Sequence, residues 1–256
     1  MFLPSGSRRV LSALTATLLG VALAGCGGDE PGPAPTGPAS PAAASEPAGD
    51  GRDALAGLAA LALDRRYAAL YTWDVGDGVP RNVIATVAND GSWRVDIPNG
   101  ALGGTTGVSI VRNANGVYQC SLPTAENPVT GMCIRVAERG DKVPRRYDPK
   151  VQRLFRQWLK VFTDRQSALA VSAVQPLPGA QGSCFAVDSV SASLDAPVDV
   201  GIYCYTPDGL LSAARVEFGL LTLVSQVAGP QAVQLPGPEV AGEPMGMNAP
   251  DVAPSA

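Results

Sequence analysis

Strand-like sequence dominates the middle of this chain, and one strongly amphipathic helical segment interrupts it. From Tyr67 onward, apolar residues alternate with polar or small ones, which is the period of a half-buried strand. Turn signals at residues 89–91, 115–116 and 207–209 contain Asn-Gly or Asp-Gly and predict tight hairpins. We therefore predict antiparallel strands over residues 67–74, 83–88, 93–97, 108–112, 117–122, 132–137, 183–190, 200–205, 210–218 and 220–227.

The interrupting helix covers residues 151–162, with Asp148 as its N-cap and Pro149 in its first turn. Its apolar residues fall on one face and its charged residues on the other, so one side should pack against the sheet. The apolar face consists of Val151, Leu154, Phe155, Trp158, Leu159 and Phe162.

Two further helices are predicted. Residues 54–63 carry apolar side chains at helical spacing behind Asp53, a suitable cap. Thr163 and Gln166 have the spacing of a capping box, which predicts a helix that runs to about Val174. Strands, a helical insert and further strands indicate an α+β domain, with helices packed on one face of an antiparallel sheet.

The N-terminus is built like an export signal. Arg8 and Arg9 precede a short apolar run over residues 10–24, which ends in the motif Leu-Ala-Gly-Cys at Cys26. The run is shorter than the ~20 apolar residues that cross a bilayer. Its ending resembles the lipobox of bacterial lipoproteins. The resemblance implies removal of residues 1–25, a diacylglycerol thioether on Cys26 with palmitate as an expected acyl chain, and anchoring on the extracytoplasmic face of the cell membrane. The alternative is an ordinary signal peptide with a chance cysteine.

Low-complexity sequence flanks one central block. Residues 26–52 are rich in Pro, Ala and Gly and lack large apolar side chains, so they cannot bury enough surface to offset their ordering entropy. We predict a disordered tether that carries the lipid and extends by up to ~3.1 Å per residue. A single domain should follow over residues 53–238. Residues 239–256 are again rich in Pro, Gly and Ala, and we predict a disordered tail there.

The charge balance excludes one class of partner. Once Arg8 and Arg9 leave with the signal, 17 basic residues face 23 acidic ones. A nucleic-acid-binding domain needs a basic patch, so we expect no nucleic-acid partner. Basic residues do gather over residues 135–156, and we interpret them as a solvated loop beside the helix.

Four of the five cysteines remain after Cys26 takes the lipid. Exported proteins sit where disulfides persist, and an even remainder suggests two bridges. Cys120 and Cys133 flank one turn symmetrically, and Cys184 and Cys204 flank another. Opposed residues of a hairpin are close enough for a disulfide, so we predict Cys120–Cys133 and Cys184–Cys204. A zinc site is not expected, because the chain has no histidine and no closely spaced cysteine pair.

Catalysis finds little support in the residues. The absence of histidine excludes the usual Ser-His and Cys-His arrangements. The glycines of residues 100–107 lack the spacing and the lysine of a phosphate loop, and Asp74 and Asp77 lack the remaining ligands of a calcium loop. A paired-carboxylate hydrolase stays open, but no acidic residue lies in a setting that marks it. We predict a non-enzymatic protein without a cofactor or a metal.

The order of elements, together with the lipobox, resembles the LolA/LolB-type half-barrel and, among actinobacterial proteins, the LppX/LprG-like lipoproteins. A tether and an N-terminal helix come first, followed by strands, an aromatic helix and further strands. Residues 182–185 (GSCF) and 203–211 (YCYTPDGLL) are similar to the C-terminal half of that group. Over residues 53–238 the resemblance implies a curved, half-barrel-like sheet, helices across its concave side and an apolar cavity for acyl chains.

The helical stripe separates the functional hypotheses. Leu154, Trp158 and Phe162 are predicted to line such a cavity, so the protein would bind or carry a lipid or another apolar ligand. In the alternative, the same side chains fill the core of the sheet. The domain would then be an interaction or scaffolding module of the cell envelope, with an exposed apolar patch for a protein partner.

Overall fold

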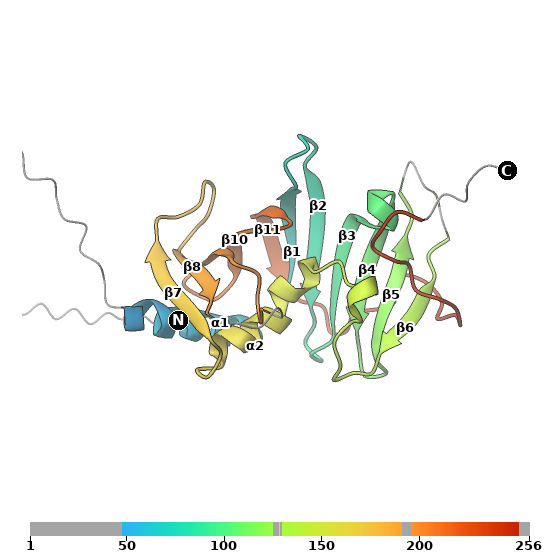
Figure 1. Cartoon of the computed structure of the whole chain (residues 1–256). Coiled ribbons are helices and arrows are strands. Elements are labelled where there is room, and N and C mark those ends of the chain that lie inside the picture. Colours follow the sequence, from blue (N-terminus) through green and yellow to red (C-terminus); the bar gives the residue numbers. More distant parts are fainter. Residues whose placement is uncertain (1–47, 125–127, 129, 191–195, 251–256) are drawn as a thin grey trace, which may run out of the picture. The chain divides into compact units, whose positions relative to one another are not determined.

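The computed structural model describes residues 48–124, 128, 130–190 and 196–250. These belong to one compact unit, Ser45–Ala256. An open antiparallel sheet of eleven strands forms the unit, together with two α-helices, so the fold class is α+β as predicted (Figure 1). The helices are α1 (Ala48–Asp64) and α2 (Gln157–Thr163), with short 3₁₀ turns at Leu102–Gly104, Arg145–Tyr147 and Val151–Phe155.

The strands are β1 (Tyr67–Asp74), β2 (Arg81–Val87), β3 (Trp93–Ala101), β4 (Thr106–Arg112), β5 (Val117–Leu122), β6 (Cys133–Ala137), β7 (Leu169–Val174), β8 (Ser183–Ser189), β9 (Gly201–Tyr205), β10 (Leu211–Val216) and β11 (Gly219–Ala228). Their order across the sheet is β6-β5-β4-β3-β2-β1-β11-β10-β9-β8-β7. The first six strands thus run outward from the centre to one edge, and the last five return from the other edge. The two series meet where Tyr67 of β1 pairs with Ala228 of β11.

The ten strands predicted from the sequence correspond to β1–β6 and β8–β11, which confirms them within a few residues. The predicted helix that was to begin at Thr163 is wrong, because its second half is strand β7. Asp164 forms a turn instead: its Oδ1 accepts a hydrogen bond from the Gln166 amide at 2.9 Å. Val171 and Val174 are β-branched and pair with β8, so sheet contacts override the capping-box pattern.

The central helical segment is broken into two parts. A 3₁₀ turn, Val151–Phe155, precedes α2, and Arg156 between them has a non-helical φ of −145°. Asp148 does not cap an α-helix as predicted. Its Oδ1 accepts hydrogen bonds from the Lys150 amide at 2.8 Å and from Gln152 Nε2 at 2.6 Å, which stabilises the chain just before the 3₁₀ turn.

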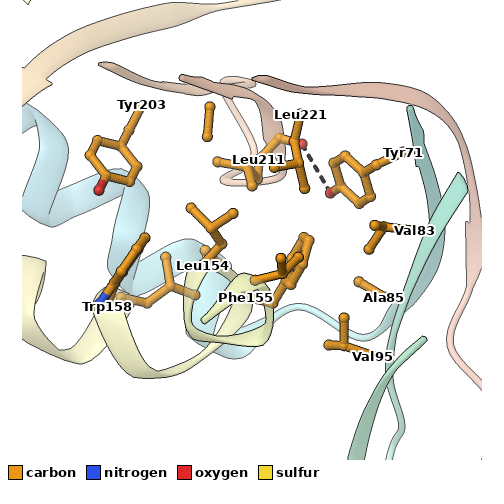
Figure 2. Close-up of a cluster of buried hydrophobic side chains, with 14 of the residues drawn as sticks. Tyr71, Val83, Ala85, Val95, Leu154, Phe155, Trp158, Tyr203, Leu211 and Leu221 are labelled. Atoms are coloured by element: carbon orange, nitrogen blue, oxygen red, sulfur yellow. Dashed lines mark hydrogen bonds between the residues drawn. The ribbon is translucent and has the colours of Figure 1, made fainter. Parts of the chain in front are cut away.

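One face of the sheet packs against these helical segments and forms the main core. Figure 2 shows Leu154, Phe155 and Trp158 pointing from the helical segment toward the strands. The Phe155 ring lies 5.1 Å from that of Tyr71, whose hydroxyl donates a hydrogen bond to the Leu211 carbonyl at 3.0 Å (dashed in Figure 2). Because the rings interdigitate, large side chains fill the space between helix and sheet.

Both predicted disulfides are present, on the opposite face of the sheet. Cys120 pairs directly with Cys133 across β5 and β6, and Cys184 with Cys204 across β8 and β9. Each bridge lies in a small apolar cluster of its own, apart from the main core. The hairpin registers proposed from the cysteine spacing are therefore confirmed.

The C-terminal strap, which we define as residues 229–250, follows β11 and differs from the disordered tail expected over residues 239–256 (dark red in Figure 1). Val233 and Leu235 of the strap pack on the Cys120–Cys133 cluster, whereas Met245 and Met247 pack against the main core on the other face. The strap therefore wraps around the edge strand β6. Its Pro- and Gly-rich composition does not favour an ordered segment, but contacts with residues distant in the sequence order it. Residues 251–256 lie outside the described part.

Candidate functional site

The predicted ligand residues Leu154, Trp158 and Phe162 come together, but in a filled core. Each exposes 2 % of its surface or less. Phe162 and Trp158 both pack on the Tyr203 ring, with centroids 5.0 and 6.0 Å apart. Leu154 and Phe162 line none of the pockets described below, whereas Trp158 borders a space of about 540 Å³. Charged residues such as Lys142, Arg145 and Arg153 line that space as well, so it is not the apolar cavity expected. The placement of the stripe agrees with the filled-core alternative.

An apolar pocket lies on the helix-facing side of β4–β6, beneath the strap. Its volume is about 590 Å³. Leu102, Met132, Ile134 and Met245 form its apolar wall. We call this space the strap pocket.

Strand alternation explains which side chains reach the strap pocket. Gln119 and Ser121 of β5 line it, whereas their neighbour Cys120 points to the opposite face and forms its disulfide there. Ile134 of β6 pairs with Gln119 and therefore lies on the same face. Met132, just before β6, is 46 % exposed. Met132 therefore forms a solvent-exposed edge of the pocket.

Gln119 is the central polar group of the strap pocket. Its side chain is buried, and its Nε2 donates hydrogen bonds to the carbonyls of Met245, at 2.9 Å, and of Tyr147, at 3.1 Å. The Met245 amide donates in return to Gln119 Oε1 at 2.7 Å. The side-chain amide therefore pairs with a peptide unit of the strap through one donor and one acceptor, as a strand neighbour would.

The glycine-rich loop between β3 and β4 holds the end of the strap. The amides of Leu102 and Gly103 donate hydrogen bonds of 2.9 Å to the carbonyls of Gly246 and Met247, respectively. Leu102 has a φ of +51°, which is unusual for a residue with a side chain. Gly103 has a φ of +68°, and a Cβ atom there would lie 2.8 Å from that of Ala249. A side chain here would push Ala249 and the strap away, which gives the loop a structural role that the sequence did not indicate.

The lining of the strap pocket is mostly apolar. Glu243 is the only ionisable residue among those that line it, and its Oε1 accepts a hydrogen bond from the Tyr147 hydroxyl at 3.4 Å. In the described ranges no cluster of three or more His, Cys, Asp or Glu residues could hold a metal ion. The lining offers apolar surface and a few fixed amide and hydroxyl groups.

A wider groove lies over β7–β9 at the other edge of the sheet, with a volume of about 870 Å³. Small residues such as Ala170 and Ala186 line it, together with the exposed Val190 and Val200. Arg52 of α1 borders it, but this guanidinium already donates to the Leu169 carbonyl at 2.9 Å and to the Asp164 and Ser167 carbonyls. The groove is therefore mostly apolar, with Arg165 and Asp188 also in its lining and Arg52 engaged in holding the edge strand.

A third, charged pocket of about 340 Å³ is lined by Asp148, Lys150, Arg153, Asp199 and Glu217, among others. Lys150 has a φ of +64°, and its Nζ lies 2.8 Å from Glu217 and 3.9 Å from Asp199. Burial raises the pKa of the Asp199 carboxyl, and the positive charge of Lys150 lowers it in part. The ion pairs connect Lys150, just before the 3₁₀ turn, to residues that adjoin β9 and β10, while Asp199 Oδ2 is buried without a hydrogen-bond partner.

Gln119 and the loop residues Leu102 and Gly103 were not among the predicted site residues. One feature of the sequence could have indicated Gln119: it is the only side-chain amide in the otherwise apolar start of β5. Cys26 lies outside the described residues. No helix in the part of the chain that the structure describes is both long and apolar enough to cross a membrane. No protein-family model matches the chain, and no curated protein has a significantly similar sequence.

Proposed function

We propose that this chain is a membrane-anchored extracytoplasmic lipoprotein whose domain binds an acyl chain or a similar apolar ligand in the strap pocket. The anchoring rests on the lipobox-like motif at Cys26. Two disulfides in the domain are in keeping with an oxidising compartment outside the cytoplasm. In this proposal the protein is a binding module and not an enzyme.

The observation that carries the ligand proposal is the strap pocket itself. Its volume of about 590 Å³ lies within the ~300–1,000 Å³ typical of small-molecule sites. Apolar side chains dominate its wall, and Gln119 provides one buried polar group to orient a ligand. An acyl chain needs such a wall, because burying its methylene groups drives binding.

We retain the resemblance to the LolA/LolB-type half-barrel as part of the proposal. An open antiparallel sheet with helices on its core side is the arrangement that this resemblance implies. The ligand position differs from the one expected, since the aromatic stripe fills its part of the sheet and the strap pocket lies over β4–β6.

Native mass spectrometry of the mature chain, purified from its membrane after detergent exchange, tests the ligand. Ile134→Trp should fill the strap pocket and remove most co-purified lipid. Ile84→Trp is the matched control, since Ile84 is an exposed β2 residue that lines none of these pockets. If the wild-type protein carries and takes up no lipid, the ligand proposal fails.

A separate experiment tests the anchor. Cys26→Ser should release the protein from the membrane fraction or stall removal of the signal. Unchanged fractionation together with an unmodified N-terminal peptide would contradict lipidation.

The filled core favours a second candidate, an envelope interaction module without a small-molecule ligand. Its partner surface would be the β7–β9 groove, where Val190 and Val200 are 64 % and 56 % exposed. Val200→Asp should then weaken capture of an envelope protein by the anchored chain while leaving any lipid content unchanged.

A further inference from the structure

The strap covers its pocket as a separate piece of chain. Residues 240–250 contain no helix or strand of their own. Pro244 and Pro250 lack amide hydrogens, and Gly242 and Gly246 lack side chains, so little within the segment resists its departure. Opening this segment would leave every strand pair of the sheet intact.

Main-chain contacts provide most of the hold on this segment. Gln119 pairs with Met245, while Leu102 and Gly103 donate to Gly246 and Met247. The Met247 amide donates to the Arg146 carbonyl at 3.1 Å. Such bonds each contribute little net free energy, because water replaces them when the segment leaves. Met245 and Met247 add only partly buried side chains.

The same contacts occupy the polar groups that a ligand would use. Gln119 and Leu102 both line the strap pocket, and both are engaged by the strap. Release of residues 242–249 would enlarge the pocket and free the Gln119 amide.

We propose that residues 242–249 form a displaceable lid of the strap pocket, held at Gln119 and at Gly103, and that the ligand enters when this lid opens. This inference rests on the proposed ligand site. A lid imposes a simple linkage: the apparent affinity equals the intrinsic affinity multiplied by the open fraction. Loosening the lid therefore raises both the rate of uptake and the apparent affinity.

Gly103→Ala tests the lid in the full mature chain. Its new methyl group would meet Ala249 at 2.8 Å and push the strap away. Gly76→Ala is the matched control, because Gly76 also has a positive φ, of +88°, but no atom lies within 4 Å of the Cβ position. The control carries the same kind of backbone strain without touching the strap.

Two measurements are made on both variants. Hydrogen exchange should be about tenfold faster at the Met245 and Met247 amides in Gly103→Ala than in Gly76→Ala, the effect of about one or two lost hydrogen bonds. Binding of cis-parinaric acid, a fluorescent long-chain fatty acid, should become about tenfold faster and tighter.

Gln119→Leu provides an independent variant that removes the hydrogen bonds to Met245. It should speed exchange at the Met245 amide as Gly103→Ala does, and only exchange is compared in this variant, because Gln119 also lines the ligand site. If the probe binds to Gly103→Ala with an affinity equal to or weaker than that of Gly76→Ala, the strap is a fixed wall and the lid is rejected. If the lid amides exchange faster but neither the wild type nor any variant binds the probe, the ligand site fails and the lid role falls with it.

Discussion

Two halves of the same sheet face are closed in different ways. In the aromatic half, Phe155 and Trp158 fill the space over Tyr71 and Tyr203 with interlocking rings. In the strap half, Met245 and neighbouring peptide units lie over Gln119 and leave about 590 Å³ open. Large side chains cover the sheet in the aromatic half, whereas a segment held by main-chain hydrogen bonds covers it in the strap half. If the proposed ligand site is correct, different segments of one sheet face provide stability and ligand access.

The largest expected effect concerns the aromatic half. Trp158→Ala removes a buried indole from a filled core and should lower the free energy of unfolding by ~3–5 kcal/mol, measured by urea denaturation. A loss below about 1 kcal/mol would show that this half is loosely packed and would remove the contrast between the halves.

Removal of a disulfide should have the second-largest effect on the free energy of unfolding. Replacing Cys120 and Cys133 together by alanine opens a loop with a sequence separation of 13 and should cost roughly 3 kcal/mol. The Cys184–Cys204 pair, with a separation of 20, serves as the comparison. Only the first change should also speed hydrogen exchange in the strap, because Val233 and Leu235 pack on that bridge. Equal exchange in both double variants would contradict this coupling.

A smaller effect is expected in the strap half. Met245→Ala should lower the free energy of unfolding by about 1 kcal/mol or less, since Met245 is only partly buried and the pocket below it is already open. The same variant should take up a fatty acid probe faster than the wild type, and stopped-flow fluorescence measures this rate. Met132→Ala, at an exposed position of the same pocket, is the control that enlarges the pocket without loosening the strap.

The smallest effect concerns Asp199, beside the aromatic half. Its side chain is 17 % exposed, and burial raises the pKa of its carboxyl in the folded state. The folded protein therefore holds this proton more tightly than the unfolded chain. The contribution of Asp199 to stability is most favourable below the unfolded pKa and is lost as the pH rises through the folded pKa.

Asp199→Asn should accordingly raise the melting temperature slightly at neutral pH and flatten its dependence on pH between mildly acidic and neutral conditions. Thermal unfolding across that range measures both changes, with Asp188→Asn at an exposed position as the control. A lower melting temperature at neutral pH would mean that the Lys150 ion pair outweighs the cost of burial.

Local pairing was predictable from the sequence. Hairpin partners are close along the chain, so turn residues and the alternation of side chains identify both the strands and their register. The pairs Cys120–Cys133 and Cys184–Cys204 follow from symmetry about a turn, and both are present. The amphipathic stripe of residues 151–162 likewise indicated the element that packs against the sheet.

Tertiary structure alone decided the features that depend on distant partners. Residues 169–174 form a strand because β8 offers hydrogen bonds that a helical pattern does not anticipate. The strap is ordered because Gln119 and Gly103, more than a hundred residues earlier in the chain, bind its peptide groups. The sequence determined the short-range elements, since their energies come from neighbours along the chain. Only the folded sheet could create the strap pocket, since its walls come from three separate parts of the chain.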